Sequence, residues 1–147
     1  MNDRRFTSST SLAWYATIVL TATYTFSFID RQIVNLLVEP IKADLLLSDT
    51  QISFLQGLAF VVPYLILSIP AGRLVDTVSR VKVLIGGIIF WSVACVFCGL
   101  SKTMTQLAIG RMGVGAGEAS VTPAAWSLLA DYFPEDKRGL PVSIFLM

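Results

Sequence analysis

Four charged residues lie inside long apolar stretches of this sequence, where charges are rare. They are two acids and two bases, Asp30, Arg31, Arg111 and Glu118. In a hydrocarbon environment each costs at least about 2–3 kcal/mol unless it faces a polar cavity or a partner. This cost makes them candidates for proton coupling and for contacts to a substrate. The alternative reading is that they only tie helices together as buried ion pairs.

The spacing of these charges predicts how they lie relative to one another. Arg111 and Glu118 are seven residues apart, about two helical turns, so they project from nearly the same helix face. A rise of about 1.5 Å per residue places Asp30 and Arg111 at a similar depth, roughly 10 Å below the outer surface, so an ion pair between them is geometrically allowed. Glu118 falls near the midplane, where burial disfavours its charged form and a neighbouring Arg favours it. A carboxylate in this position can release and take up a proton as its Arg partner moves.

Other kinds of chemistry have little support in the sequence. There is no His, no cluster of metal ligands and no nucleophile with a neighbouring base, so we expect no enzyme, no metal and no cofactor. Cys95 and Cys98 form a C-x-x-C, but they are embedded in an apolar helix and are interpreted as packing thiols. The Lys and Arg residues are scattered into loops without a basic stripe, which argues against nucleic-acid binding.

The elements that must hold these charges are membrane-spanning helices. Hydrophobic residues make up 54% of the 147 residues and charged residues 14%, with a mean hydropathy of +0.70. The apolar runs do not alternate with polar residues as barrel strands would, so an all-α, polytopic membrane protein is predicted. We expect four spans and the start of a fifth, at about 12–37, 52–69, 83–100, 104–132 and from 141 onward. The run from 141 to 147 is too short to cross a membrane, so we expect the chain to stop inside a helix.

The distribution of Lys and Arg predicts the orientation in the membrane. Seven of them fall on the side of the N-terminus and two on the opposite side, so residues 1–11 are expected to form a cytoplasmic tail in an inner (plasma) membrane protein. A cleaved signal peptide is the alternative, but the first apolar stretch is too long and has no clear cleavage site. The longest external loop is expected at 39–50, with Ser48 as the N-cap of the next helix.

Two glycine-containing segments stand out. The residues of the first are spaced for a tight cytoplasmic turn with a charged latch, and they are Gly72, Leu74, Asp76, Arg80 and Lys82. On this interpretation they form a cytoplasmic gate, whereas the simpler reading is that the bases only mark topology. The second segment is a row of small residues in the fourth span, Gly113, Gly115 and Gly117, which permits close helix packing.

These two segments resemble the two signature motifs of the major facilitator superfamily. The turn matches the family's loop between helices two and three, although Thr77 and Ser79 stand where the family usually has a base and a glycine. Arg111 with Gly115 and Gly117 resembles the second signature. Within the superfamily the chain looks most like spinster-like transporters. That likeness rests on Asp30, Arg31 and residues 115–120, 123–125, 129–134 and 138–139. Anion:cation symporters of sugar acids and organic anions share the Asp-Arg pair and are the runner-up.

The resemblance implies a fold and a function. The family fold has twelve helices in two six-helix halves, so residues 12–147 would be part of the N-terminal half, and transport would require the C-terminal half. The implied function is secondary active transport, with protons and a lysolipid- or sphingolipid-like substrate as partners. Asp30 and Glu118 would be the coupling sites, and Arg31 and Arg111 would be their partners or contacts to an anionic substrate. An alternative from another class is a self-contained four-helix membrane protein that oligomerises.

Overall fold

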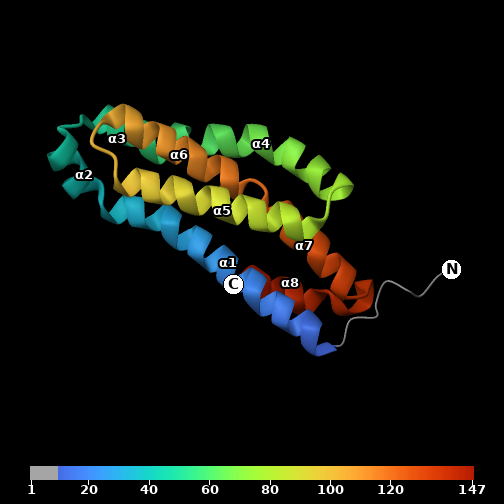
Figure 1. The fold of residues 1–147 in the computed structure, drawn as a ribbon. Helices are drawn as coiled ribbons and strands as arrows, with labels where there is room; N and C mark the ends of the chain where they lie inside the picture. Colours follow the sequence, from blue (N-terminus) through green and yellow to red (C-terminus); the bar gives the residue numbers. More distant parts are fainter. Residues whose placement is uncertain (1–9) are drawn as a thin grey trace.

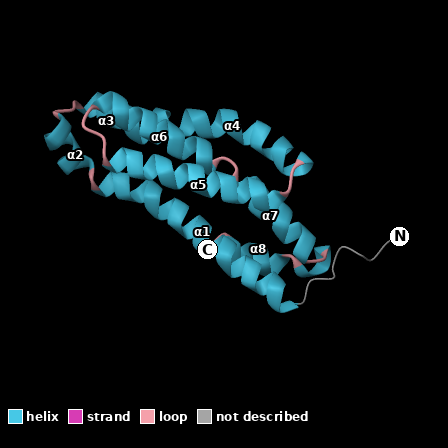
Figure 2. Ribbon diagram, viewed as in Figure 1, coloured by secondary structure: helices cyan, strands magenta, loops and turns pink. Residues whose placement is uncertain are grey.

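The computed structural model describes residues 10–147, which are helical almost throughout and contain no strand (Figures 1 and 2). Residues 1–9, most of the expected cytoplasmic tail, lie outside the described residues. The all-α prediction is therefore confirmed for the described part. The elements are α1 (Thr10–Leu36), α2 (Val38–Leu45), α3 (Asp49–Gln56), α4 (Leu58–Thr77), α5 (Arg80–Gly99), α6 (Met104–Glu118), α7 (Val121–Tyr132), the short 3-10 helix η1 (Glu135–Lys137) and α8 (Gly139–Phe145).

Three segments are long and apolar enough to cross a membrane. They are Thr10–Leu36, Asp49–Thr77 and Arg80–Gly99, and the second of these joins α3 and α4 across a kink at Gly57. Only 22–28% of the residues in their most apolar windows are buried within the described chain. The remaining apolar side chains point outward, as they do where helices face lipid or other helices.

The fourth expected span is divided into two helices. α6 ends at Glu118, α7 begins at Val121, and a turn at Ala119–Ser120 joins them. Pro123 has no N–H to donate to the carbonyl of Ala119, and its ring would crowd that carbonyl in a continuous helix. The backbone N–H of Ala124 instead bonds to Ser120 O at 3.2 Å and starts the new helix. The break places Glu118 at the very end of α6.

The helices are arranged around α6 and α7. α6 packs between α4 and α5, and α7 continues toward the other end of the bundle, where it meets α1, α4 and α5 (Figure 1). α8 lies against α1, with the rings of Tyr24 and Phe145 5.0 Å apart, and Trp14 meets Phe133 edge-on at 5.6 Å. The largest buried cluster, which includes Leu20, centres on α7. This arrangement brings α1 beside both α5 and the end of α6.

The glycines of α6 sit where neighbouring backbones come close. A Cβ on Gly115 would lie 2.4 Å from the carbonyl oxygen of Phe60, and one on Gly117 would lie 2.7 Å from the backbone nitrogen of Trp91. At Gly113 the nearest atom would be the Cβ of Ala94, at 3.0 Å. The distances at Gly115 and Gly117 leave no room for a methyl group, whereas the contact at Gly113 is only tight. Gly115 and Gly117 therefore set how closely α6 approaches α4 and α5.

The segment expected as an external loop at 39–50 is partly helical, since α2 covers Val38–Leu45. The predicted N-cap is confirmed: Ser48 caps α3 in a capping box with Gln51. Lys42 forms an ion pair with Asp49 between α2 and α3. A side-chain hydrogen bond to Asp49, together with its charge, raises the pKa of Lys42 above its ordinary value.

Arg138 closes the C-terminal end of α7. Its guanidinium donates through Nε to the carbonyl of Phe133 and through Nη2 to the carbonyl of Ala130, both at 2.7 Å. These carbonyls lack partners within the helix, and a cation near a helix C-terminus also interacts favourably with the helix dipole. Arg138→Met is therefore expected to lower the free energy of unfolding by about 1–2 kcal/mol.

The measurement for this prediction is thermal unfolding of the full-length protein in detergent. Lys137→Met is the matched control, because Lys137 is an exposed neighbour with no such bonds recorded in the described residues. Equal melting temperatures for the two variants would contradict the capping role.

Candidate functional site

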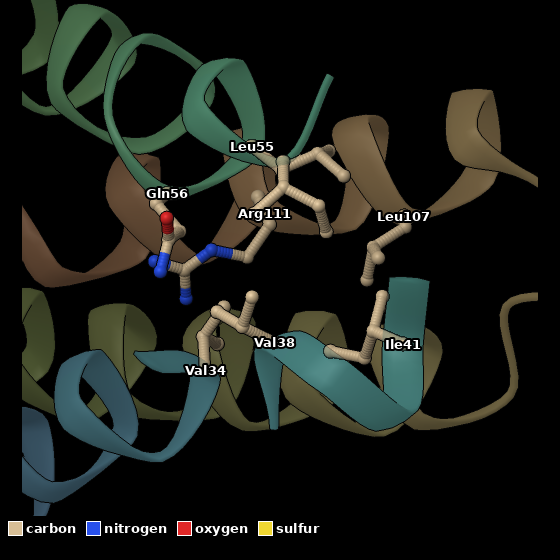
Figure 3. A pocket seen from close by; sticks show the side chains of 8 residues that line it. Val34, Val38, Ile41, Leu55, Gln56, Leu107 and Arg111 are labelled. Atoms are coloured by element: carbon tan, nitrogen blue, oxygen red, sulfur yellow. The ribbon is translucent and has the colours of Figure 1, made fainter. Parts of the chain in front are cut away.

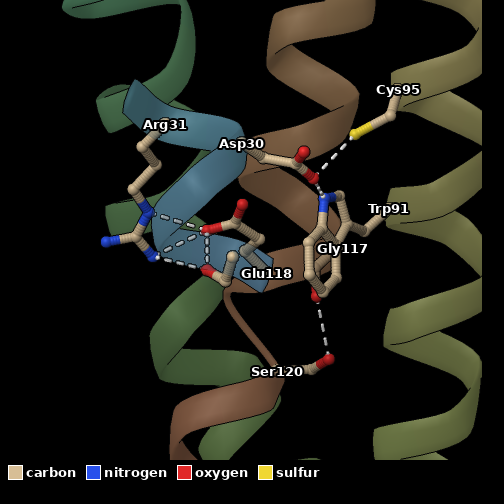
Figure 4. A network of polar contacts seen from close by, with 8 residues as sticks. Asp30, Arg31, Trp91, Cys95, Gly117, Glu118 and Ser120 are labelled. Carbon is tan, nitrogen blue, oxygen red and sulfur yellow. Dashed lines mark hydrogen bonds and ion pairs between the residues drawn. The ribbon is translucent and has the colours of Figure 1, made fainter. Parts of the chain in front are cut away.

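Glu118 and Arg31 form a buried ion pair between α6 and α1. Arg31 donates to Glu118 Oε2 through Nε at 2.8 Å and through Nη2 at 2.6 Å, and the hydroxyl of Ser27 donates to the same oxygen at 2.7 Å (Figure 4). Glu118 is 1% exposed, whereas the Arg31 side chain keeps 34% of its surface. The second oxygen, Oε1, is buried without a hydrogen-bond partner. One carboxylate oxygen thus receives three hydrogen bonds while the other has none.

Asp30 points away from this pair, toward α5. Its Oδ2 accepts a hydrogen bond from the indole Nε1 of Trp91 at 2.7 Å and one from the thiol of Cys95 at 3.3 Å (Figure 4). Successive residues of a helix are separated by about 100°, which is why Asp30 and Arg31 reach different neighbours. The similar depth of Asp30 and Arg111 in the membrane allowed an ion pair between them, but the described residues do not form it. The ion-pair partner of Glu118 is Arg31.

Arg111 is a buried cation without a carboxylate partner. It is 4% exposed, its Nε has no hydrogen-bond partner, and residues 10–147 include no acid within ion-pair distance of it. Figure 3 shows its guanidinium reaching past Leu55 to lie near Gln56, with Val34 of α1 on the other side. Burying a charge in this way is unfavourable unless something compensates it.

Aromatic rings of α4 provide part of that compensation. The ring of Phe60 lies 5.1 Å from the guanidinium carbon of Arg31 and 5.1 Å from that of Arg111, so it contacts both cations. Tyr64 stacks on Phe60 and lies 5.4 Å from Arg31. Each cation–π contact contributes about 0.5–2 kcal/mol, depending on how far the cation is desolvated.

A cavity of about 380 Å³ lies between α1, α2, α5 and α6. Asp30 and Arg111 both line it, and Asp44 lies on its wall at α2. Most of the remaining wall is apolar, including Ile33 and Leu107. The cavity therefore combines a buried cation with surfaces suited to hydrocarbon.

The predicted gate residues gather at the other end of the bundle. α4 ends at Thr77 and α5 begins at Arg80, so the turn between them is tight. Arg80 forms an ion pair with Asp131 of α7, while Asp76 and Lys82 are exposed. A Cβ on Gly72 would meet nothing within 4 Å, and Leu74 is 48% exposed. Within the described residues, Arg80 is the only one of these five that forms an ion pair.

The sequence analysis did not identify several members of the site. Ser27 lies one helical turn before Arg31, and Phe60 lies one turn before Tyr64, so spacing of four residues was the available signal. Trp91 and Cys95 show the same spacing on α5, but nothing local to them indicates an acid as their partner. Further from the centre, Asp131 was noted only as part of a family-like stretch and not as the partner of Arg80.

Comparison with known proteins gives the family. Residues 20–147 match the family model described as Major Facilitator Superfamily. An MFS-type efflux pump from Mycolicibacterium smegmatis is 36% identical over 132 residues, which cover 90% of this chain and 31% of the pump. A probable L-galactonate transporter from Escherichia coli is 31% identical over 119 residues, covering 81% of this chain and 26% of that protein.

A solved structure shows the same fold and supports the likeness to spinster-like transporters. It is the crystal structure of a bacterial homologue of the human lysosomal transporter Spinster, in an inward-facing and unoccupied conformation. It superposes with a TM-score of 0.92 at 36% identity, covering 95% of this chain and 29% of the other. The chain thus spans about a third of the length of the relatives it matches. With a family match over residues 20–147, the chain belongs to the major facilitator superfamily.

Proposed function

We propose that the full-length protein is a proton-coupled secondary transporter that carries an amphipathic anion of the lysolipid or sphingoid-phosphate type by alternating access. The observation that carries this proposal is Arg111, a buried guanidinium that has no carboxylate partner within residues 10–147 and lies on the wall of a mostly apolar cavity. A phosphate or carboxylate head group would satisfy its free donors. The apolar walls would accommodate the hydrocarbon part of the same molecule.

Proton coupling is assigned to Glu118 and Asp30. Protonation of Glu118 removes the charge that holds Arg31, and so weakens the contact between α1 and α6. Arg31 is then free to bind an anion or to move with α1. Exchange of a proton for a guanidinium partner is a local charge change of the kind that can bias two arrangements of a helix pair.

The remaining parts of the proposal concern the whole protein. The N-terminus is assigned to the cytoplasm and the protein to the inner (plasma) membrane. The turn with Gly72, Leu74, Asp76, Arg80 and Lys82 is assigned to a cytoplasmic gate. The contact between Arg80 and Asp131 supports this, because it joins the turn to α7 across the bundle end. Transport requires the second half of the fold, since rocking of one half against the other moves the site between the two sides of the membrane.

A sugar-acid or other organic-anion substrate is the second candidate. It is favoured by the relative named as a probable L-galactonate transporter. The carboxylate of a sugar acid could also bind Arg111, but the many hydroxyl groups of such a substrate need polar partners. The mostly apolar cavity wall favours the amphipathic anion instead.

Uptake by the full-length protein in proteoliposomes tests the proposal and separates the two candidates. The probes are radiolabelled lysophosphatidylethanolamine, sphingosine-1-phosphate and glucuronate, each with and without an imposed pH gradient. We expect saturable uptake of one or both lipids that depends on the gradient. Uptake of glucuronate alone would establish the second candidate. Uptake at the same rate with and without the pH gradient would contradict proton coupling. Vesicles containing only residues 1–147 are expected to show no saturable uptake.

Arg111→Gln is expected to weaken uptake of the transported anion about tenfold to a hundredfold, because a charge-assisted hydrogen bond contributes about 1.5–3 kcal/mol. Arg111→Lys keeps the positive charge but loses the planar guanidinium that can donate two parallel hydrogen bonds to one anion. We therefore expect its uptake to lie between those of Arg111→Gln and the parent protein. Lys102→Gln, at an exposed position between α5 and α6, is the control. Unchanged uptake in Arg111→Gln would remove Arg111 from substrate binding.

A further inference from the structure

The ring of Phe60 is shared by two guanidinium groups. The guanidinium carbons of Arg31 and Arg111 each lie 5.1 Å from the centre of this ring. An aromatic ring carries negative potential on its faces, so it attracts a cation at this distance, most strongly where water is excluded. Phe60 is 7% exposed and Arg111 is 4% exposed. The contact between Phe60 and Arg111 is therefore desolvated and belongs to the stronger kind.

The Phe60 ring is the rigid member of this group. A Cβ on Gly115 would lie only 2.4 Å from the carbonyl oxygen of Phe60, so the backbone of α4 rests directly against α6 at this point. The ring stacks on Tyr64, with 5.8 Å between the ring centres, and belongs to a buried cluster with Trp91 and Val114. An arginine side chain, by contrast, is long and has many rotamers, so its charged end stays in one place only where something holds it.

The two arginines depend on the ring to different degrees. Arg31 is held by two hydrogen bonds to Glu118 (Figure 4) and also lies 5.4 Å from the ring of Tyr64. Arg111 lacks such support, because its Nε is unpaired and residues 10–147 place no carboxylate within ion-pair distance of it. Within the same residues, the aromatic ring that contacts its guanidinium is that of Phe60. Phe60 is thus better placed to orient Arg111 than any charged group of the described chain.

We propose that Phe60 is a positioning residue whose ring face holds the guanidinium of Arg111 at the cavity wall, in the position that binds the substrate anion. This inference rests on the proposed anion site at Arg111 and deepens it by naming the residue that keeps the cation in place. The rival explanation is that Phe60 only fills space in the core, as buried Phe residues commonly do. The two roles differ in one property, because holding a cation needs the electrons of the ring face whereas packing needs only the shape of the ring.

Weakening the ring face is expected to lower the affinity for the anion. An anion binds those molecules in which the guanidinium is in position, so its apparent affinity falls with the fraction of such molecules. A cation–π contact changes an equilibrium constant by roughly twofold to thirtyfold, with the larger values in desolvated sites. Loss of the contact between Phe60 and Arg111 should therefore weaken anion binding within this range.

Fluorinated phenylalanines at position 60 of the full-length protein separate the two roles. Mono-, di- and trifluorophenylalanine withdraw electrons stepwise from the ring face and change the size of the ring little. Binding of sphingosine-1-phosphate and of glucuronate is measured in parallel, in nanodiscs. For the anion that the parent protein binds, we expect the affinity to fall with every added fluorine. The same series at Phe28 is the control, because that ring is 56% exposed on α1 and contacts no cation within the described residues, and its affinities should stay equal.

A second measurement needs no ligand. In protein with isotope-labelled arginine, NMR relaxation reports how ordered the side chains of Arg31 and Arg111 are, and their signals are identified by their loss in Arg31→Lys and Arg111→Lys. Phe60→Leu is expected to make the Arg111 side chain more mobile. Arg31 should stay ordered in the same variant, since Glu118 still holds it.

Two results would each overturn the positioning role. One is equal anion affinity along the series at position 60, and the other is an Arg111 side chain that stays as ordered in Phe60→Leu as in the parent protein. Should Phe60→Leu fail to fold, the fluorinated variants keep the shape of the ring and decide by both measurements.

The same experiments distinguish failure of this role from failure of the proposed function. If neither anion binds the parent protein, the anion site at Arg111 is wrong, and the mobility of Arg111 along the fluorinated series still decides whether Phe60 holds its guanidinium. If Arg111→Gln loses anion binding while the fluorinated variants bind like the parent protein, the anion site stands and the role of Phe60 is wrong.

Discussion

Glu118→Gln is expected to abolish uptake driven by a pH gradient while leaving exchange of substrate across the membrane intact. Gln has nearly the shape of the protonated acid, so its side chain can still accept a bond from Ser27. It cannot release a proton or restore the charge that holds Arg31. Steps that need deprotonation should therefore slow at least about 100-fold, which is the lower end of what a positioned proton-transfer group contributes. Exchange between loaded vesicles and labelled substrate needs no net proton movement and should continue.

The paired measurement is gradient-driven uptake and equilibrium exchange in the same proteoliposomes. Glu135→Gln is the control. The Glu135 side chain, in η1, is 93% exposed, and its nearest oxygen is as far as 4.0 Å from Arg138. It should behave like the parent protein in both assays. Loss of both uptake and exchange in Glu118→Gln would indicate a structural role for the ion pair, and normal uptake would remove Glu118 from the mechanism.

The helical spans could be read from the sequence because they depend on local properties. Apolar length and the position of bases indicate where a helix enters and leaves the membrane. The break between α6 and α7 was missed, although Pro123 and the preceding glycines were visible. Hydropathy adds up the apolar length of 104–132 and does not register a missing hydrogen bond inside it. The small helix α2 was missed for a related reason, because a short polar segment between spans resembles a loop.

The charges of the site could be located from sequence, but their pairing could not. Depth along the membrane normal follows from residue counting, and it allowed Asp30 to meet Arg111. The rotation of each helix about its axis is set by packing with distant segments, and Trp91 lies 61 residues from Asp30 in the chain. That rotation turns Asp30 to α5 and Arg31 to α6. The acid that pairs with an Arg is therefore decided by the helix contacts that the glycines permit.

Gly117→Ala is expected to prevent correct packing of α6 against α5. The added Cβ would lie 2.7, 2.8 and 2.9 Å from the nitrogen, Cβ and Cα of Trp91. Two of these three atoms are backbone and cannot rotate away, so the helices must separate. Overpacking of this kind costs about 1–3 kcal/mol and occasionally more, and we expect the upper end of that range. Trp91 also donates a hydrogen bond to Asp30, and Glu118 follows Gly117 directly. The same displacement should therefore disturb both the Trp91–Asp30 hydrogen bond and the Arg31–Glu118 ion pair.

The test is the yield of monodisperse full-length protein and its melting temperature in detergent, with Gly86→Ala as the matched control. Gly86 lies on α5, and a Cβ there would meet nothing within 4 Å. Replacing a helical Gly by Ala at an open position is normally stabilising by up to about 1 kcal/mol, because Ala loses less backbone entropy on folding. The two variants should thus move the melting temperature in opposite directions although they make the same chemical change. A Gly117→Ala protein as stable as Gly86→Ala would mean that α5 and α6 can separate without cost, and the close contact that orients Trp91, Asp30 and Glu118 would not be what defines the site.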